Sequence, residues 1–400
     1  MNKKAIQRVT SLRTRDGSAK VLSEELFFDL VYVFSVTQLS HYLLDHLTLL
    51  GALQTLVMWL AVWLGWQYSA WATNWFDPGA LRIRGMLFGI MLLALVMASA
   101  LPGAFAERGL IFALCFAGIQ VGRTFCMLLA VGRDHALAPN FRRILAWNCV
   151  GAAFWIGGGF AEGQARLLLW CGGVLCEYIA PMIGLRFPGL GRSLTTDWTI
   201  DGGHLAERCQ LFVIVALGES VLATGVAFGH HAEWHPVDLF AFFVSFAGSL
   251  AMWWMYFDTS AKEATHAIEH ASDPGGMGAK YHYTHMILVA GIIVSAVADE
   301  LVIGEGSHHA QLKYLGPLLG GPALYLFGNA LFKRVVRGFL PQSHLVGLVL
   351  LALVASFASH LSVSAVGTLT TIVMITVTVL EAVWRRRAWA TDETSKTRQH

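Results

Sequence analysis

The sequence predicts an all-α, polytopic membrane protein with about twelve transmembrane helices, arranged as two parallel six-helix repeats. Three observations predict this fold class: few charged residues, apolar runs long enough to cross a bilayer, and a second half that repeats the first. The chain of 400 residues is 56% hydrophobic and 14% charged, whereas roughly a quarter of the residues in a soluble domain are charged. This deficit of charge excludes an ordinary soluble enzyme.

Apolar runs of about 20 residues, the length that crosses the hydrocarbon core as a helix, recur along the whole chain. The spans expected in the first half are 24–43, 49–72, 83–101, 109–131, 141–160 and 165–186. Those expected in the second half are 205–229, 236–257, 282–303, 311–332, 343–361 and 364–384. The Gly/Pro-rich stretch from Arg186 to Ser193 is expected to connect the halves, and the extra segment around Glu263 to Gly278 to be a solvated loop.

The distribution of Lys and Arg predicts the orientation. With the N-terminus in the cytoplasm, 24 of the 28 basic residues fall on the cytoplasmic side, three on the opposite side, and Arg123 inside a span. This bias follows the positive-inside rule, so we expect both termini to be cytoplasmic. The basic tails are attributed to this topology and to anionic membrane lipids, and nucleic acid is not an expected partner.

The internal duplication predicts the domain boundaries. The stretch from Glu25 to Leu39 has a counterpart 182 positions later, from Glu207 to Val221. Because each repeat holds an even number of spans, the two halves share one orientation in the membrane. The predicted parts are a cytoplasmic basic leader (1–22), a first membrane repeat (23–190), a second membrane repeat (191–386) and a cytoplasmic tail (387–400).

Ionisable residues inside a span are costly in lipid and are therefore candidates for function. Glu25 and Asp29 are four residues apart and share a face of the first span, and Arg123 lies at a similar depth on the fourth. We expect Asp29 and Arg123 to pair, either at a polar transport site or as a salt bridge that only supports the architecture.

The seventh span carries a second pair of carboxylates. Glu207 stands at the position that matches Glu25, and Glu219 at the position that matches Thr37. Glu219 falls near the bilayer midplane beside small residues, which favours a transported-ion or proton site over a protonated carboxyl that only bonds a neighbouring helix. Glu177, on the sixth span, is a further carboxylate within the membrane.

Two polar groups are expected at the membrane surfaces. The first is a cytoplasmic-side cluster of residues at helix ends, which could gate by protonation or only anchor those ends by hydrogen bonds; its members are Asp77, His204, Asp258 and His285. The second is an outer vestibule for cations, formed by Asp299 and Glu300, unless both are simply solvated.

Several of these motifs, in this order, resemble a known family. They are the opening from Glu25 to Phe34, His204-Leu-Ala-Glu-Arg208, Phe212-Val-Ile-Val-Ala-Leu-Gly-Glu-Ser220, Trp253-Trp-Met-Tyr-Phe-Asp258 and Tyr283-Thr-His285. The combination resembles the bacterial low temperature requirement protein A (LtrA) family over residues of about 22 to 385. The resemblance implies a multi-pass protein of the bacterial cytoplasmic (inner) membrane that is associated with growth in the cold, and it implies no mechanism.

A more distant resemblance concerns mechanism. Phe28-Asp29, followed by Thr37, is similar to the Phe-Ser-Asp motif of organellar and bacterial potassium channels built from duplicated six-helix units. The Ser of that motif is replaced here, and Leu211 stands at the position that matches Asp29, so potassium selectivity is not carried over. The resemblance implies that the first and seventh spans face each other and line a path.

Two functional classes remain open. The favoured class is a channel or secondary transporter for a small cation or solute, with its polar site between the first and seventh spans. The alternative is a membrane-embedded enzyme that acts on a lipid or quinone near the cytoplasmic interface, which no triad or nucleotide loop supports. No cofactor and no metal site are expected. The expected partners are membrane lipids and the small ion or solute, with a homo-oligomer left open.

Overall fold

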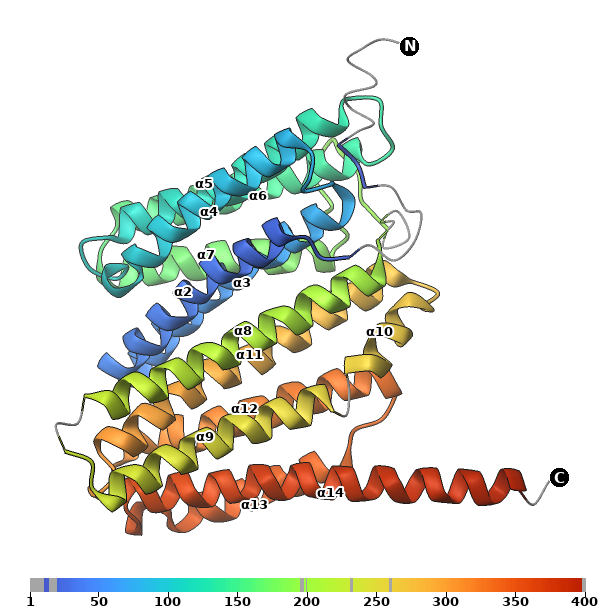
Figure 1. Ribbon diagram of the computed structural model, residues 1–400. Helices are drawn as coiled ribbons and strands as arrows, with labels where there is room; N and C mark the ends of the chain where they lie inside the picture. The colour runs from blue at the N-terminus through green and yellow to red at the C-terminus, as the bar shows by residue number, and fades with distance from the viewer. Residues whose placement is uncertain are drawn as a thin grey trace. The chain divides into compact units, whose positions relative to one another are not determined.

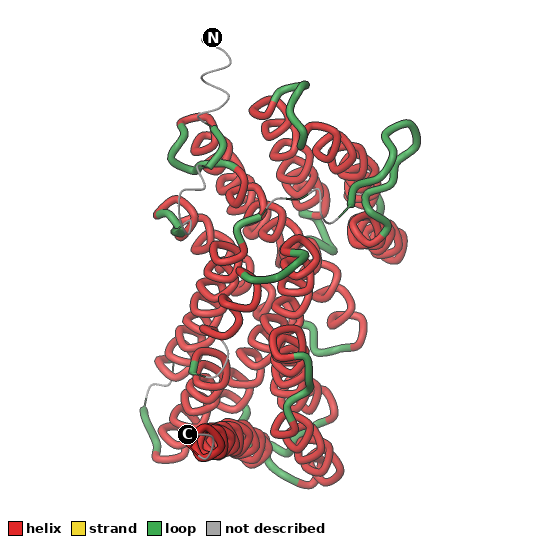
Figure 2. The backbone as a smooth tube through the Cα atoms, turned by 90° about the vertical axis from the view of Figure 1, so that its right-hand side faces the viewer, coloured by secondary structure: helices red, strands yellow, loops and turns green. Residues whose placement is uncertain are grey.

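The described part of the chain consists of helices and the loops that join them (Figure 2). The structure is a computed structural model that describes residues 11–13, 20–194, 198, 200–230, 233–258 and 261–397. Within these residues the extended contacts are isolated bridges, such as the one between Leu12 and Phe76. The predicted all-α class is confirmed.

Each predicted span coincides with a helix (Figure 1). The helices of the first half are α2 (Ser23–Asp45), α3 (Leu49–Trp75), α4 (Leu81–Ala100), α5 (Gly109–Val131), α6 (Ala138–Phe160) and α7 (Gly163–Met182). Those that follow are α8 (Gly202–Gly229), α9 (Pro236–Phe257), α10 (Ala261–Glu269), α11 (Pro274–Gly304), α12 (Leu312–Arg337), α13 (Gln342–Phe357) and α14 (Val363–Thr397). Short 3₁₀ turns follow α4 at Leu101–Gly103 and α13 at Ala358–His360.

Ten helices of the described chain are long and apolar enough to cross a membrane. Helices α2 and α6 lie outside this set because their mean hydropathy is lower. The first two turns of α2 hold Glu24, Glu25 and Asp29, and the start of α6 holds Arg142 and Arg143. A helical protein with many apolar spans is therefore shown, while the twelve spans and the two six-helix repeats stay predictions.

The segment from Glu263 to Gly278 is not the loop that we expected. It contains α10, and α11 begins at Pro274, eight residues before the predicted start at 282. Ala264 and Ile268 are both buried at 0% exposure. Because they are four residues apart, they form one apolar stripe on an otherwise polar helix, which packing stabilises and a loop would leave exposed.

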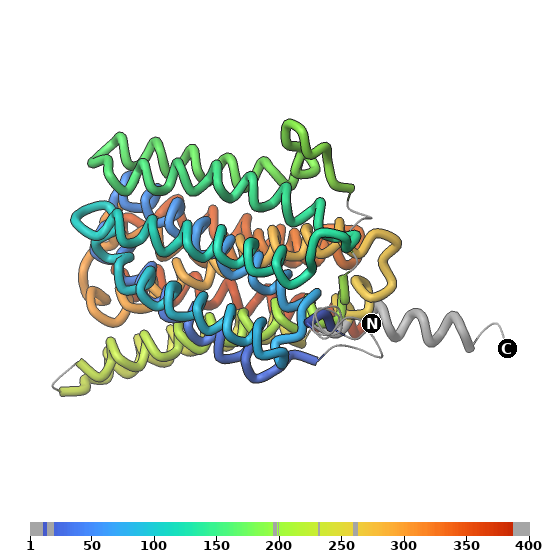
Figure 3. The backbone as a smooth tube through the Cα atoms, turned by 90° about the horizontal axis from the view of Figure 1, so that it is seen from above, coloured from blue at the N-terminus to red at the C-terminus, as the bar shows by residue number. Residues whose placement is uncertain are grey.

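The chain divides into two compact units. The first unit comprises Met1–Val215 and Ile268–His282, and the second comprises Ala216–Ala267 and Tyr283–His400. Within the first unit, α5, α6 and α7 pack against one another in chain order (Figures 1 and 3). Within the second unit, α14 packs against both α9 and α13.

The N-terminal segment is tied to the end of α3. The Arg13 N–H donates to the Trp75 carbonyl at 3.0 Å, and the Asp77 N–H donates to the Ser11 carbonyl at 3.0 Å. Residues 11–13 therefore run antiparallel to residues 75–77 and contribute to the first unit. This pairing fixes the position of the Arg13 side chain, which proves important below.

Within the second unit, glycines let α11 and α12 approach each other closely. A Cβ added at Gly328 of α12 would lie 2.6 Å from the Leu288 backbone nitrogen of α11. Small residues at such crossings replace the hydrophobic driving force that membrane helices lack, because they bring the backbones into van der Waals contact.

We predict that Gly328→Ala lowers the melting temperature of the purified protein, because overpacking at a backbone contact costs about 1–3 kcal/mol. The matched control is Gly320→Ala on the same helix, where an added Cβ meets nothing within 4 Å. The control is expected to be neutral or slightly stabilising, since Ala favours a helix over Gly by about 1 kcal/mol. Equal melting temperatures for the two variants would contradict the close approach.

Candidate functional site

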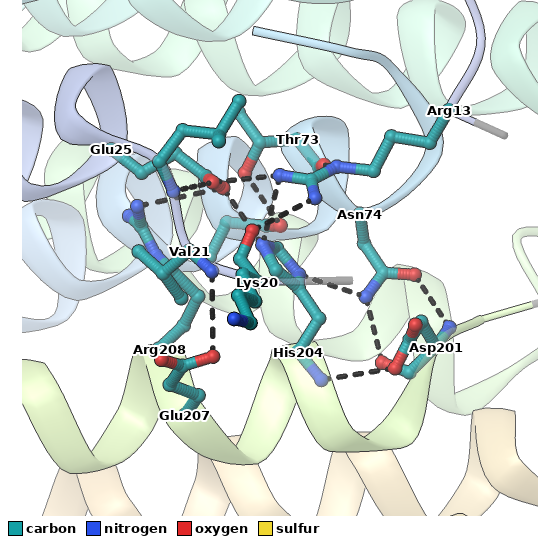
Figure 4. Close-up of polar contacts among 12 residues, drawn as sticks. Arg13, Lys20, Val21, Glu25, Thr73, Asn74, Asp201, His204, Glu207 and Arg208 are labelled. Atoms are coloured by element: carbon teal, nitrogen blue, oxygen red, sulfur yellow. Dashed lines mark hydrogen bonds and ion pairs between the residues drawn. The ribbon is translucent and has the colours of Figure 1, made fainter. Parts of the chain in front are cut away.

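A cluster of buried charges joins the beginning of α2 to the beginning of α8 inside the first unit (Figure 4). Glu25, Asp29 and His204 are 0% exposed and Arg208 is 1% exposed. We call these four residues, together with Arg13, the ion network. The spacing of its members explains its form: Glu25 and Asp29 are one helical turn apart on α2, and His204 and Arg208 are one turn apart on α8.

Glu25 is the most heavily bonded carboxylate of the ion network. One oxygen accepts from Arg13 Nη2 at 2.7 Å and from the Leu22 N–H at 3.0 Å. The other contacts His204 Nε2 at 2.9 Å and lies 3.7 Å from Arg208 Nη1. The Leu22 N–H is one of the unpaired donors at the start of α2, so the same carboxylate also caps its own helix.

Asp29 lies one turn deeper and is paired on one side only. Its Oδ1 accepts from Arg208 Nη2 and from Trp66 Nε1 of α3, each at 2.7 Å. Its Oδ2 has no hydrogen-bond partner among the described residues. A buried carboxylate oxygen without a donor is costly. Arg208 Nε and Nη1 also have no hydrogen-bond partner among the described residues, so the ion network has both an unsatisfied acceptor and unsatisfied donors.

His204 has polar neighbours at both ring nitrogens. Asn74 Oδ1 accepts from the Asp201 N–H at 2.8 Å, so its Nδ2 points the other way, where it donates to the Asp201 carbonyl at 2.8 Å and meets His204 Nδ1 at 3.1 Å. His204 Nε2 lies 2.9 Å from Glu25 Oε1 and 3.2 Å from Arg13 Nη2. Asp201 Oδ1 also accepts from the His204 N–H at 3.0 Å and so caps the start of α8.

Arg13 is a structural member of the ion network rather than a lipid-facing charge of the leader. Its side chain is 10% exposed. Besides its bond to Glu25, its Nε donates to the Thr73 carbonyl at 2.6 Å and its Nη1 to the Lys20 carbonyl at 3.2 Å. The planar guanidinium thus binds three stretches of chain at once, which an ammonium group cannot do with the same geometry.

The predicted pair of Asp29 and Arg123 is wrong. Asp29 pairs with Arg208, while Arg123 donates to Gln120 Oε1 at 2.5 Å and to the Gly65 carbonyl and Ser69 Oγ at 3.3 Å each. Both charges are buried, as expected, but the sequence does not give the direction in which a side chain leaves its helix.

Arg123 instead belongs to a second buried group, which also contains Glu177. Gln120 Nε2 lies 3.5 Å from Glu177 Oε1, and Trp155 Nε1 donates to Glu177 Oε2 at 3.2 Å. Glu177 is 3% exposed. We call Gln120, Arg123 and Glu177 the inner polar group; it joins α5 to α7 and is the environment of the carboxylate predicted within the sixth span.

Helices α2 and α3 also carry buried polar atoms that have no hydrogen-bond partner among the described residues. In the described chain, the buried atoms that lack a hydrogen bond include Tyr32 Oη and Ser35 Oγ of α2, and Trp63 Nε1 and Gln67 Oε1 of α3. Tyr32 lies against Gly65, where an added Cβ would be 2.7 Å from its hydroxyl, and the Gly65 carbonyl accepts from Arg123. We call these four side chains the polar seam; they belong to α2 and α3, two helices that pack against each other.

The other predicted residues of the first unit have ordinary helix-end roles. Asp77 Oδ1 accepts from the Gly79 N–H at 2.8 Å in the turn between α3 and α4, so it anchors that turn. Glu207 Oε2 accepts from the Val21 N–H at 3.4 Å at the edge of the ion network (Figure 4). Of the two members of the cytoplasmic-side cluster in this unit, only His204 joins the ion network.

The second unit holds the remaining candidates. Asp258 Oδ2 accepts from Arg385 Nη2 at 2.5 Å, and His285 Nε2 lies 2.7 Å from the Tyr256 hydroxyl. Glu219 is half-buried on α8 and forms no hydrogen bond or ion pair with another described residue, so its role stays a prediction. Asp299 and Glu300 are half-buried near the end of α11, and Asp299 Oδ2 lies 3.4 Å from Ser220 Oγ.

The sequence analysis did not predict that Arg13 and Arg208 belong to the ion network, nor that Lys333 pairs with Glu381. Arg13 and Arg208 were both expected on the cytoplasmic side, and so was Lys333, which is buried in the second unit against Glu381. A signal for Arg208 was present. His204 and Arg208 repeat on α8 the four-residue spacing of Glu25 and Asp29, so two complementary faces could have been matched.

Within the described residues, no group of three or more His, Cys, Asp or Glu side chains is placed to hold a metal ion. In the ion network, Asp29 Oδ2 could instead accept a hydrogen bond from water or a polar solute, or coordinate a small cation.

Comparisons with known proteins identify relatives over almost the whole chain. The family model described as bacterial low temperature requirement A protein (LtrA) matches residues 20–379. A protein of Rhizobium meliloti (strain 1021), named "Uncharacterized protein RA0937", is 36% identical over 362 residues, which are 90% of this chain and 88% of that protein. No solved structure matches.

We predict that Asp29→Asn and Arg208→Gln each lower the free energy of unfolding by about 3–5 kcal/mol, because each leaves its partner's charge buried and unpaired. The double variant is expected to lose about 1–3 kcal/mol less than the sum of the two. The measurement is reversible unfolding of the purified protein in detergent micelles.

The matched control is the pair of Glu24 and Arg84, which are joined at 2.7 Å but whose side chains are 15% and 40% exposed. Glu24→Gln and Arg84→Gln should each cost about 1 kcal/mol or less, as exposed ion pairs do. If the losses in free energy of unfolding from Asp29→Asn and Arg208→Gln were strictly additive in the double variant, the two side chains would not interact energetically.

Proposed function

We propose that this chain, which belongs to the bacterial low temperature requirement A (LtrA) family, is a channel or secondary transporter for a small cation or solute. Its polar site would lie along α2, between the start of α8 and the facing side of α3. The proposal includes the predicted setting: a bacterial inner membrane, both termini in the cytoplasm, twelve spans in two repeats, and a link to growth at low temperature.

The single observation that carries the proposal is the polar seam. Each buried polar atom without a partner costs about 1–3 kcal/mol, and lipid offers no hydrogen bonds in return. Four such side chains on two adjacent helices are therefore expected to be satisfied by water or by a transported group. A seam that served only to hold α2 against α3 would be apolar.

The ends of the polar seam support a path rather than an isolated wet pocket. At one end Asp29 presents its unpaired Oδ2, and at the other Tyr32 contacts Gly65, whose carbonyl accepts from Arg123. From Glu25 to Ser35 the α2 backbone rises about 15 Å, roughly half the hydrocarbon thickness. Charged groups at Asp29 and beside Tyr32, with the hydroxyl of Ser35 one turn further along α2, are what an ion or solute path requires.

The ion network is proposed to anchor this path at its cytoplasmic end. Two carboxylates and two guanidiniums balance each other, so a cation arriving at Asp29 Oδ2 would compete with Arg208 for the carboxylate. Such competition could couple binding to a movement of α8 relative to α2. The enzyme alternative has no observation in its favour: within the second unit, Asp258 and His285 contact Arg385 and Tyr256.

The test is gradient-driven flux of Na⁺, K⁺ and H⁺ into proteoliposomes that hold the purified protein, followed with ion-sensitive dyes. We expect Asp29→Asn to reduce the flux at least about tenfold, since a bond to a charged group contributes about 1.5–3 kcal/mol. Tyr32→Phe and Ser35→Ala, which remove only hydroxyls of the polar seam, should give smaller reductions without unfolding the protein.

Glu24→Gln is the matched control, because Glu24 lies next to Glu25 on α2 but pairs with the partly exposed Arg84. Its flux should equal that of the wild type. The proposal fails if the wild type moves none of the three ions, or if folded Asp29→Asn, Tyr32→Phe and Ser35→Ala all match it.

A further inference from the structure

A small cavity lies inside the second unit, among four of its helices. It has a volume of about 30 Å³ and is lined by residues of α9, α11, α12 and α14. One water-sized particle needs roughly 10–15 Å³ when volume is measured in this way. The cavity therefore has room for an ion with a water molecule, and not for an organic substrate.

The wall of the cavity carries oxygen atoms in an otherwise apolar surrounding. They come from one carboxylate and four hydroxyls, belonging to Asp299, Ser245, Ser295, Thr370 and Thr371. Ser295 is 6% exposed, and its hydroxyl has no hydrogen-bond partner among the described residues. A buried hydroxyl that lines a polar cavity without a partner indicates a missing ligand.

The two threonines have their oxygen lone pairs available. Thr370 Oγ1 donates to the Gly367 carbonyl at 2.9 Å, and Thr371 Oγ1 lies 3.4 Å from the Val244 carbonyl. Because a hydroxyl has one proton and two acceptor positions, a hydroxyl that donates to a carbonyl can still coordinate a cation.

A proline adds a further oxygen to the same wall. Pro322 lies inside α12 and lines the cavity together with Leu318. A proline has no N–H, so the Leu318 carbonyl four residues earlier lacks its intrahelical bond. Freed backbone carbonyls at interrupted membrane helices are typical ligands of alkali cations.

We propose that this cavity binds a sodium ion, with Asp299 as the charged ligand and the hydroxyls of Ser245, Ser295 and Thr370 among the neutral ones. Charge selects a monovalent ion: one carboxylate neutralises it, whereas a divalent ion would leave a net charge buried in the membrane. Asp299 is itself half-buried, so the ion reaches the cavity from the surface at the end of α11.

The sodium site adds a bound ion to the proposed function. Sodium binding is independent of transport, and only the coupling of sodium to solute movement rests on the proposed function. In a secondary transporter, this ion would be the one whose gradient drives the solute. Binding itself does not require flux, so it is tested on the purified full chain, and a failure of either proposal can be told apart from a failure of the other.

The experiment compares the melting temperature of the protein in NaCl, KCl and choline chloride at equal ionic strength. In NaCl at about ten times the dissociation constant, ligand linkage should raise the melting temperature by about 2 °C or more over the other two salts. Asp299→Asn should abolish this difference, and Ser295→Ala should raise the sodium concentration for half-maximal effect at least about threefold.

Glu305→Gln serves as the matched control, because Glu305 is an exposed carboxylate in the turn that follows α11 and pairs with His308. It should keep the full sodium-specific shift. Ser295→Ala removes one oxygen atom from a folded protein, so it provides a readout even if Asp299→Asn does not fold. The proposal is overturned if the three salts act alike on the wild type, or if Ser295→Ala and folded Asp299→Asn keep the wild-type sodium response.

Discussion

The first unit depends on the balance of four buried charges. Glu25 and Asp29 could not be ionised inside an apolar bundle alone, and neither could the guanidiniums of Arg13 and Arg208. Together they neutralise one another at distances of 2.7–3.7 Å. This constraint fixes where the N-terminal segment folds back, how the end of α3 is held, and at which residues α2 faces α8.

The helices could be predicted from the sequence because membrane insertion is encoded by length and hydropathy, which are properties of a single segment. The predicted spans at 109–131 and 236–257 coincide with α5 and α9 to the residue. The early start of α11 and the whole of α10 were not predicted. Their apolar residues are separated by polar ones, so these segments resemble a polar loop until the apolar residues are packed against the rest of the protein.

The contacts within the candidate site could not be predicted in the same way. The predicted repeat aligns residues 182 positions apart, yet the bonds of Glu25 with His204 and of Asp29 with Arg208 join residues 179 positions apart. Residues that a repeat aligns occupy equivalent positions in the two halves, and residues at equivalent positions need not contact each other. Arg13, Arg208 and Lys333 were counted on the cytoplasmic side, and their ion pairs inside the protein were not expected, for a related reason. Positions along the chain suggest which side a residue is on, whereas burial depends on a partner that is distant in sequence.

The distance between Asp29 and Arg208 along the chain also bears on biosynthesis. The carboxylates of α2 leave the ribosome long before their partner in α8, which is 179 residues further on. At roughly 5–20 residues per second this interval is roughly ten to forty seconds. During that time the carboxylates of α2 have no partner from α8, and α2 lies outside the ten apolar helices. Helix α2, the first that the structure describes, is therefore among the last to reach its final environment, and nascent chains cut before α8 would carry an α2 that is not stably inserted.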